Sequence, residues 1–480
     1  MEGPQQERRR YFSCGTVTEM TDYSHDGIEI DSEISRIRSI LVNSGRFDFP
    51  EAERRLAASR LSLIVGEDAA STPTGQAAFL TAAVTSTRCF GQVSADGAID
   101  VPLLLPLPVS ARSLAEAAAA FGVRRADALP RAKQILIGTG RESETGWAVR
   151  AYWDGWTAGI APVTGARSVG RSDCTLAGVA AGALAVGQAF LAEQGDARAG
   201  KIAQNLSLWL PGADEQATRD PGPIWKEVFL PASLWLIGLG NLGQAFLWSL
   251  TLLPYSTPQD VLLLLQDDQR IGKENWGTSV LVERGQYGSL KTRVAEDWAI
   301  RRGFQVQRID RRLDENLFRK PTEPGIALAG LDRMPPRRLL GQRGFEYVID
   351  AGLGATVGDY RKFRINTFDR TLDPADHFAG VEDETEQRIQ NLMQLPAYAE
   401  LAVERGDGGC GAATLAGSSV AVPFVSAFVG ALAISQAIRI SSGEAHHSAI
   451  TGETGDMKSV RTELGNAAER ITVNSVHAAD

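Results

Sequence analysis

A glycine-rich turn in the second half of the chain has the residue types of a phosphate-binding loop. Apolar residues 234–237 are followed by the pattern G-x-G-x-x-G, formed by Gly238, Gly240 and Gly243, with Asn241 inside it. The first glycine permits a tight turn, the second lets the backbone approach a phosphate, and the third lets a helix pack closely on a strand. The N–H groups at the start of the following helix attract an anion. The pattern therefore predicts a nucleotide site.

A carboxylate is placed to hold the sugar of that nucleotide. The next apolar run, residues 261–265, ends in Gln266-Asp267-Asp268. In a dinucleotide fold, an acid at the tip of the second strand accepts hydrogen bonds from a ribose. Asp267 is thus the predicted ribose ligand. A glycine turn that serves packing alone is the alternative interpretation of the loop.

The elements that must position this site occur twice in the chain. The segment GQAAFL at 75–80 matches GQAFL at 243–247, and each follows an apolar run. Later, GALAVGQA at 182–189 matches GALAISQA at 430–437. Two matches in the same order indicate a duplication. Chance similarity between alanine-rich helices is the alternative.

Apolar strand-like runs alternate with helical stretches in both halves, which is typical of parallel sheets with crossover helices. The expected fold class is α/β, with two tandem Rossmann-like modules that form a pseudo-dimer. We expect a flexible arm over residues 1–30, a first module over 31–222, a second module over 223–445 and a polar tail over 446–480. A Pro/Gly-rich linker over residues 211–223 separates the modules.

Composition limits the classes of partner and location. The 480 residues carry a formal net charge of −9, which argues against nucleic acid or an anionic membrane as the main partner. No apolar run follows the basic residues 8–10, and none approaches about 18 residues, so neither a secretory signal nor a membrane span is expected. Cys14, Cys89, Cys174 and Cys410 form no C-x-x-C pair, so we expect no structural zinc and reduced thiols in a cytoplasm.

The residues beyond the second apolar run resemble the signature of the ubiquitin-activating, ThiF and MoeB superfamily. Aligned without gaps, Asp267 takes the family's first acid, Asn275 its asparagine and Lys291 its lysine. Further on, residues 327–333 resemble the strand that ends in Thr-Asp-Asn, with Asp332 at the aspartate. The resemblance covers about residues 225–445 in order. It implies two ThiF-type modules, of which the first is the degenerate copy found in larger members.

This resemblance implies an enzyme that adenylates the C-terminal glycine of a ubiquitin-like protein. The carboxylate attacks the α-phosphorus of ATP and pyrophosphate leaves, while a lysine, an amide donor and a metal stabilise the charge on the phosphates. By resemblance, Lys291 contacts the phosphates, Asn275 donates a hydrogen bond beside them, Asp332 holds Mg²⁺ and Asp267 holds the ribose. The structural alternatives are a solvated lysine, a turn-capping asparagine and a helix-capping aspartate.

Two departures from the family pattern bear on phosphate binding. The second acid of the pair falls on Gln269, although Asp268 is adjacent, and the family's arginine falls on Thr278, which removes a bidentate phosphate donor. A further arginine usually comes from the partner module. The segment around Arg38 resembles the start of that fold, so Arg38 is a candidate to enter the second module's site. An arginine on an amphipathic helix beside Arg36 is the alternative.

The two modules differ at the phosphate loop. In the first module the matching loop, residues 65–75, lacks the close glycines and contains Glu67, Asp68 and Pro73. Carboxylates at that place repel a phosphate. We therefore expect ATP to bind the second module and not the first.

A cysteine near the end of the second module is a candidate nucleophile. Gly408-Gly409-Cys410-Gly411 precedes a long apolar helix. A thiol near a helix N-terminus has a lowered pKa and is a better nucleophile. In the family, a cysteine near this place accepts the activated carboxyl as a thioester before transfer to a conjugating enzyme. A small buried residue that packs the helix start is the alternative for Cys410.

Three rival functions stay open. Activation of a sulfur-carrier protein is one, although those relatives are usually shorter and often carry zinc cysteines. A nicotinamide-dependent oxidoreductase is another, but it has no need of Lys291 and Asp332, and the chain offers it no clear catalytic histidine. The third is a scaffold that binds a modifier without activating it. The Ala/Arg-rich composition suggests a bacterial source, and we expect a monomer that acts as a pseudo-dimer, or a homo-oligomer.

Overall fold

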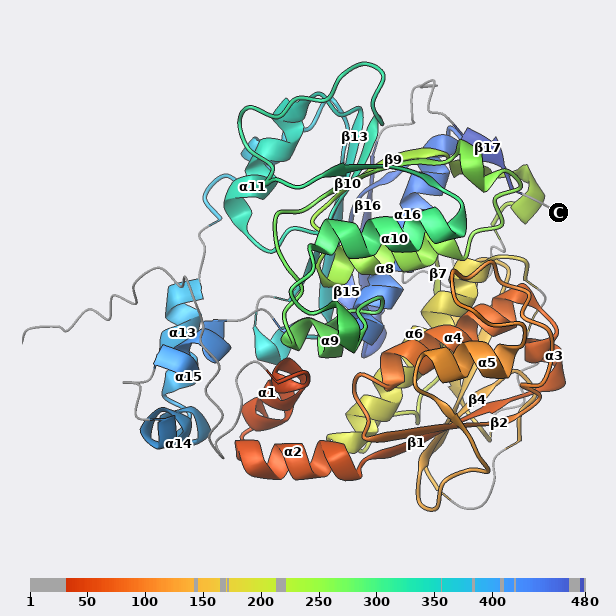
Figure 1. Cartoon of the computed structure of the whole chain (residues 1–480), viewed down its shortest axis with the longest axis vertical. Coiled ribbons are helices and arrows are strands. Elements are labelled where there is room, and N and C mark those ends of the chain that lie inside the picture. The colour runs from red at the N-terminus through yellow and green to blue at the C-terminus, as the bar shows by residue number, and fades with distance from the viewer. Residues whose placement is uncertain are drawn as a thin grey trace, which may run out of the picture.

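The computed structural model describes most of the chain. The described residues are 32–141, 146–164, 170, 172–212, 222–354, 356–381, 385–405, 410–417, 420–465 and 475–478. The expected N-terminal arm and part of the linker lie outside them. Figure 1 shows two sheets, each accompanied by helices, with the second module above the first.

The first sheet has seven strands in the order β3-β2-β1-β4-β5-β6-β7. The neighbours from β3 to β5 are parallel, and β6 and β7 continue the sheet antiparallel. The strands are β1 (Arg60–Val65), β2 (Gln92–Gly97), β3 (Arg124–Arg125), β4 (Lys133–Ile137), β5 (Ala148–Asp154), β6 (Thr157–Pro162) and β7 (Gln204–Ser207).

The second sheet has eight strands in the order β11-β10-β9-β12-β13-β14-β15-β16. Its first five strands are parallel and the last three run antiparallel to their neighbours. The strands are β9 (Ser233–Ile237), β10 (Leu262–Gln266), β11 (Gln305–Ile309), β12 (Ile326–Ala329), β13 (Tyr347–Leu353), β14 (Lys362–Phe368), β15 (His447–Glu453) and β16 (Asp456–Leu464). A separate pair joins β8 (Phe229–Pro231) to β17 (Ser475–His477).

The helices that matter for the site begin where the sequence places good first residues. Thr72 accepts a hydrogen bond from the N–H of Gly75 at the start of α4, and proline opens both α4 and α16. Gly303, with φ +97°, ends α10. The helices are α1 (Ser35–Asn43), α2 (Phe49–Ala58), α3 (Glu67–Ala70), α4 (Pro73–Ser86), α5 (Leu114–Ala120), α6 (Thr175–Glu193), α8 (Asn241–Thr251), α9 (Glu274–Thr278), α10 (Lys291–Arg302), α11 (Met334–Leu339), α12 (Pro374–His377), α13 (Thr385–Met393), α14 (Pro396–Arg405), α15 (Cys410–Gly417) and α16 (Pro423–Ser441).

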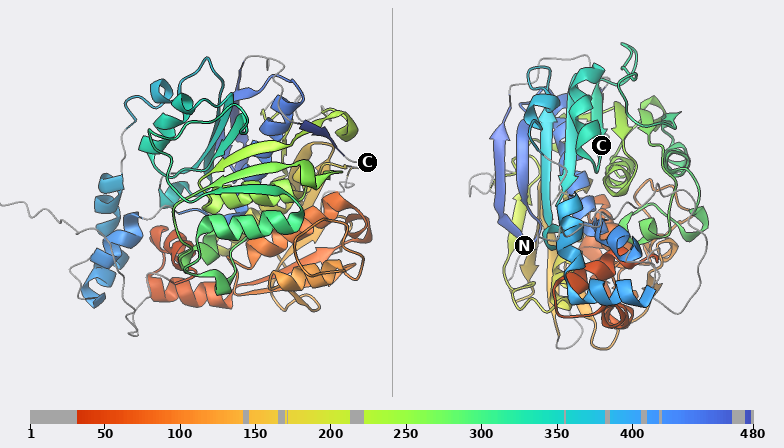
Figure 2. Two further views of the ribbon diagram at one scale, coloured as in Figure 1. Left: turned by 45° about the horizontal axis from the view of Figure 1, so that its top comes forward. Right: turned by 90° about the vertical axis from the view of Figure 1, so that its left-hand side faces the viewer.

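The two sheets repeat one topology, which confirms the expected fold class. The two halves share the strand order and the change from parallel to antiparallel pairing. Helix α4 corresponds in place to α8, and α6 corresponds to α16. Helix α6 packs against α4, α8 packs against α16, and α6 and α16 pack on each other where the modules meet. Figure 2 shows the two sheets with these helices between them. The chain is therefore a pseudo-dimer of Rossmann-like modules.

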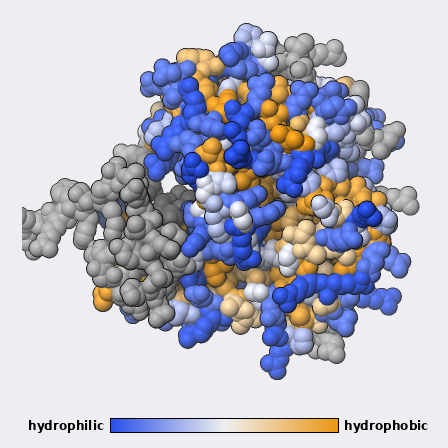
Figure 3. Space-filling model, in the orientation of Figure 1, coloured by the Kyte–Doolittle hydropathy of each residue, from blue (hydrophilic) through white to orange (hydrophobic). Residues whose placement is uncertain are grey.

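The two central helices are almost wholly apolar because they are buried from every side. By length and composition alone, α6 and α16 pass as membrane spans, yet 89% and 94% of their most apolar windows are buried inside the protein. Both therefore read as core helices. The molecular surface in Figure 3 mixes hydrophilic and hydrophobic side chains.

The expectation of a polar tail over residues 446–480 is wrong for the part of it that is described. Strands β15 and β16 extend the second sheet, and β17 pairs with β8. Only a few apolar residues, such as Ile450, Met457 and Val460, are buried, and buried and exposed positions do not alternate regularly. Such strands show neither an apolar run nor a two-residue alternation in the sequence.

Close contact between α4 and α6 depends on glycine. A Cβ atom at Gly182 lies 2.2 Å from the carbonyl oxygen of Ala78, and one at Gly178 lies 2.1 Å from that of Thr74. We predict that Gly182→Ala lowers the thermal unfolding midpoint by several degrees, because overpacking against backbone costs about 1–3 kcal/mol. Gly187→Ala on the same helix is the control, since its Cβ meets no backbone and only the ring of Phe424, at 3.3 Å. Equal midpoints in scanning fluorimetry contradict the proposed close packing.

Candidate nucleotide site

The glycine turn after β9 has the geometry of a phosphate loop. Gly238 has φ +83°, and a Cβ there lies 2.8 Å from the carbonyl oxygen of Gly330. A Cβ at Gly243 lies 2.0 Å from the carbonyl oxygen of Gly238, so helix and turn touch through glycine. At Gly240 an added Cβ meets nothing within 4 Å, and α8 begins at the next residue, Asn241. The loop therefore presents an open backbone and a helix N-terminus at one point.

The loop lies where the strand order of the second sheet reverses. The chain passes from β9 to β10 on one side, whereas β12 pairs with β9 on the other. Ligands of open α/β sheets bind outside the carboxyl ends of the strands at such a switch point. Residues that follow β9, β10 and β12 therefore lie at the same edge of the sheet.

Asp267, at the end of β10, holds the glycine loop in place. Its Oδ2 accepts a hydrogen bond of 2.7 Å from the N–H of Leu239, and its Oδ1 accepts one of 2.8 Å from the N–H of Gln269. A carboxylate has further acceptor capacity, so these bonds leave room for a hydroxyl donor. The neighbouring Asp268 is exposed and forms an ion pair of 2.6 Å with Arg312 instead.

Lys291 is buried at the start of α10, with an exposed fraction of 8%. Its Nζ donates a hydrogen bond of 2.7 Å to Oε1 of Gln269, and its backbone N–H donates to the carbonyl oxygen of Gln269 at 2.9 Å. Lys291 is therefore not a solvated surface lysine. The neutral amide of Gln269 positions the ammonium without neutralising it, which leaves positive charge for an anion.

Two amide side chains hold the two ends of α9, and one of them connects α9 to the glycine loop. Asn275 is buried and its Oδ1 accepts a hydrogen bond of 2.9 Å from the N–H of Gly272. Asn241 donates from Nδ2 to the carbonyl oxygen of Thr278, which ties the start of α8 to the end of α9. Thr278 itself is 1% exposed, and its hydroxyl bonds back to the carbonyl oxygen of Glu274 at 3.3 Å. The threonine therefore offers no substitute for the family's arginine.

Asp332 lies in the connection between β12 and α11 and is exposed. The residue at the helix cap is Arg333, with no side-chain cap hydrogen bond, so Asp332 does not cap α11. Within the described part of the chain, no group of three or more His, Cys, Asp or Glu side chains has a metal-binding arrangement. A single carboxylate suits Mg²⁺, which binds proteins through one or two carboxylates and takes its remaining ligands from phosphates and water.

Arg38 does not reach the second module's site. The side chain is 1% exposed, forms an ion pair with Glu53 and donates a hydrogen bond of 2.7 Å from Nη2 to the hydroxyl of Ser32. These contacts keep it within the first module, between α1 and α2. The expectation that Arg38 crosses between the modules is therefore wrong.

Arg36 takes the place expected of Arg38. Its Nη2 lies 3.8 Å from Oε1 of Glu274 on α9. Burial lowers the pKa of Arg36, and the negative charges of Glu274 and Asp332 oppose that shift. Residues two apart on a helix point about 200° apart, so only one of the two arginines faces the second module. Sequence analysis missed Arg36 because the direction of each side chain depends on how α1 packs.

The first module closes the corresponding position with its own carboxylate. Oδ1 of Asp68 accepts hydrogen bonds from the N–H of Thr139 at 2.8 Å and from its hydroxyl at 2.6 Å. A Cβ at Gly66 lies 2.6 Å from both Asp68 and Gly140. Protein atoms fill the space at this loop, so it lacks the open backbone found at Gly240.

Cys410 opens α15, a helix of eight residues, and does not lie at the start of the long helix α16. Nothing is described of its side chain or of Gly408 and Gly409. Helices α13, α14 and α15 pack on one another, and Figure 1 shows them beside α1 and α2. Tyr398 of α14 anchors the group, since its ring lies 5.3 Å from that of Phe49.

Comparison with known proteins identifies the family. The model of the BilD N-terminal domain matches residues 60–208, and that of the BilD C-terminal domain matches residues 230–444. A bacterial E1-like protein BilD from Collimonas sp. (strain OK412) is 35% identical over 435 residues, which cover 89% of this chain and 92% of that protein.

Solved structures of E. coli MccB are more distant. The structure with MccA-N7isoASN is 14% identical, with a TM-score of 0.32 over 50% of this chain and 67% of MccB. The structure with ATP is 13% identical, with a TM-score of 0.33 over 50% of this chain and 66% of MccB. A likeness with so low a TM-score does not identify the family. The sequence matches identify it. On those matches, the chain belongs to the BilD family of bacterial E1-like proteins.

Proposed function

We propose that the chain uses ATP to adenylate the C-terminal glycine carboxylate of a ubiquitin-like protein. The single observation that carries the proposal is the open backbone at Gly240 and the N-terminus of α8, with the buried ammonium of Lys291 opening α10 in the same module. The name of the 35% identical relative, an E1-like protein, supports the same chemistry. A nicotinamide enzyme has no use for a lysine held in this way.

In the proposed reaction, the N–H groups at the start of α8 and the ammonium of Lys291 bind the triphosphate. Asp267 accepts hydrogen bonds from the ribose, and Asn275 donates one beside the phosphates. Mg²⁺, held by Asp332, supplies charge neutralisation when bound. A carboxylate oxygen of the terminal glycine bonds to the α-phosphorus as the bond to the β-phosphate oxygen breaks, which gives an acyl adenylate and pyrophosphate.

Arg36 is the proposed contribution of the first module to this site. Its guanidinium faces Glu274 and is attracted by the negative charge of Asp332. Arg36 is therefore the cation that α1 brings toward the proposed site. A guanidinium is a good partner for phosphate oxygens. It therefore compensates for the arginine that Thr278 replaces.

The later steps of the proposal concern partners. The sulfur of Cys410 then bonds to the acyl carbon as the bond to AMP breaks, which gives a thioester and releases AMP and the thiol proton. The acyl group passes from this thioester to a thiol of a conjugating enzyme, in the cytoplasm and without nucleic acid or membrane. Activation of a sulfur-carrier protein is the alternative within the class, and a binding scaffold without activity is the alternative outside it. Gln269 and Thr278 depart from the family's phosphate-binding residues, so the experiment below also tests the scaffold.

The test of the proposal is ATP–pyrophosphate exchange with candidate modifiers that end in glycine. Asp332→Ala is expected to abolish exchange, because the metal loses its carboxylate. Cys410→Ser is expected to preserve exchange and to remove only a covalent adduct that a thiol reductant cleaves. Asp376→Ala, an exposed carboxylate on α12, is the control for Asp332. Modifier binding without exchange favours the scaffold, and tight binding of a nicotinamide cofactor favours the oxidoreductase.

A second prediction addresses the buried lysine. Lys291→Met keeps the length of the side chain and removes its charge. We expect exchange to fall by about 10²-fold or more, since a preorganised donor to transition-state charge is worth that much. Lys320→Met, which removes an exposed lysine paired with Glu323, is expected to leave exchange unchanged. Similar rates for the two variants refute the role given to Lys291.

A third prediction separates the two arginines of α1. Arg36→Met is expected to lower exchange by about tenfold or more, as expected for a charge-assisted contact to phosphate. Arg38→Met is expected to lower the thermal unfolding midpoint, because Glu53 loses its partner, while exchange per folded molecule stays unchanged. The opposite pattern assigns the crossing role back to Arg38.

A further inference from the structure

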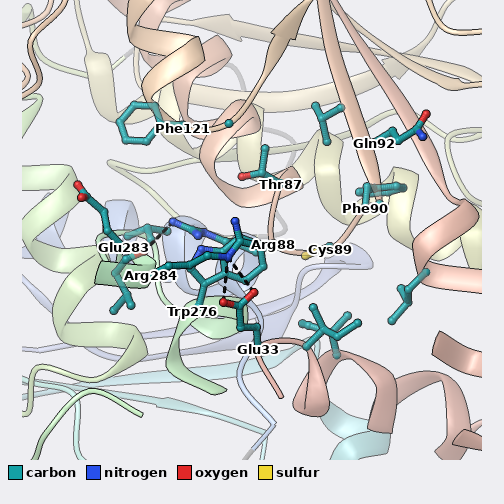
Figure 4. A pocket seen from close by; sticks show the side chains of 18 of the residues that line it. Glu33, Thr87, Arg88, Cys89, Phe90, Gln92, Phe121, Trp276, Glu283 and Arg284 are labelled. Carbon is teal, nitrogen blue, oxygen red and sulfur yellow. Dashed lines mark hydrogen bonds and ion pairs between the residues drawn. The ribbon is translucent and has the colours of Figure 1, made fainter. Parts of the chain in front are cut away.

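A large cavity lies between the modules, apart from the glycine loop. Its volume is about 1280 Å³. The first module contributes the start of α1 and the turn from α4 to β2, and the second contributes the segment after α9. Figure 4 shows charged and aromatic side chains on one side of it, among them Arg88, Trp276 and Arg284.

Helix α9 separates this cavity from the nucleotide site. Lys273 and Trp276 are three residues apart and line the cavity, whereas the carbonyl oxygen of Thr278 accepts a hydrogen bond from Asn241 of the glycine loop. Positions three apart share one face of a helix. The cavity and the nucleotide site are therefore neighbours with a common wall.

The polar wall of the cavity holds more positive than negative charge. The guanidinium carbons of Arg88 and Arg284 lie 4.5 and 4.2 Å from the ring centre of Trp276. Glu33 is already engaged, since it accepts hydrogen bonds from Arg284 at 2.9 Å and from the hydroxyl of Tyr287. Two arginines thus share one carboxylate.

Arg88 forms no direct ion pair with a described residue, because the nearby carboxylate of Glu33 is bonded to Arg284 and Tyr287. It is 7% exposed, and its Nη2 donates a hydrogen bond of 3.0 Å to the carbonyl oxygen of Val282. Its Nε has no hydrogen-bond acceptor among the described residues. Burial, together with the nearby positive charge of Arg284, lowers the pKa of Arg88 to about 10. A buried guanidinium with an unsatisfied Nε and no direct ion pair is unfavourable until an anion joins it.

Several other residues that line the cavity are apolar. They include Leu56, Val93, Phe121, Val280 and Leu281. An inorganic ion has no use for such a surface, while an uncharged hydrocarbon leaves Arg88 unsatisfied. Ligand pockets typically combine an apolar lining with a few placed polar groups in this way.

We infer that this cavity binds an organic anion with an apolar body, with its carboxylate, sulfonate or phosphate group at Arg88 and its apolar part against the wall of Val93, Phe121 and Leu281. The site is separate from the proposed adenylation site. It takes a small molecule and needs neither ATP nor a modifier. The first module, which lacks an open phosphate loop, thereby has a binding role of its own.

The test uses the fluorescent probe anilinonaphthalenesulfonate and its uncharged analogue N-phenylnaphthylamine with the full chain. The sulfonate is expected to bind at one site per chain, at least about tenfold more tightly than the uncharged probe, because a charge-assisted hydrogen bond to a buried group is worth that factor. Saturating ATP with Mg²⁺ is expected not to displace it. Equal affinity for both probes, or displacement by ATP, overturns the inference without any variant.

A variant locates the probe. Arg88→Met is expected to weaken sulfonate binding by about tenfold or more and to leave binding of the uncharged probe within about twofold. Arg293→Met, which removes an exposed arginine of α10 outside the cavity lining, is the charge-matched control. Equal sulfonate affinity in the two variants overturns the assignment to Arg88. If Arg88→Met does not fold, the comparison of the two probes on the unmodified chain decides.

Discussion

The packing of α6 against α16 is the contact on which the rest of the structure depends. It joins the two modules about their pseudo-symmetric centre, and hydrogen bonds across the junction fix its register. Thr175 donates to the carbonyl oxygen of Leu252 at 3.0 Å, and Ser435 donates to that of Leu208 at 2.8 Å. Only with the modules in this register does α1 of the first meet α9 of the second. The proposed nucleotide site and the neighbouring cavity both arise from that meeting.

The duplicated fold has diverged at its functional loops. In the second module the loop is open at Gly240, whereas in the first module Asp68 occupies the corresponding place and bonds to Thr139. The framework of strands and central helices is retained in both. The first module therefore positions α1 and part of the cavity wall. It does not need an open phosphate loop for this, and side chains fill that loop.

Much of the fold could be predicted from the sequence because its central strands are uniformly apolar and its glycine turn is highly constrained. Gly238 and Gly243 are fixed by contacts closer than a Cβ allows, so their spacing alone indicates the turn. Strands β15 and β16 gave no such signal, since many of their residues are exposed or only partly buried and they form no apolar run. The choice between Arg36 and Arg38 could not be made from the sequence, because it depends on the rotation of α1 in the assembled protein. The cavity combines residues from both modules and leaves no local pattern.

The pairing of β17 with β8 links the two ends of the second module. Leu230 lies opposite Val476, so the last described residues are held beside the strand that enters the Rossmann-like sheet. Phe229 also donates its N–H to the hydroxyl of Ser442 at the end of α16, at 3.0 Å. The strand at the start of the second module is thus held by residues from its end. Strand β8 is synthesised long before residues 475–477, so during synthesis it leads into the glycine-loop module without the strand that pairs with it.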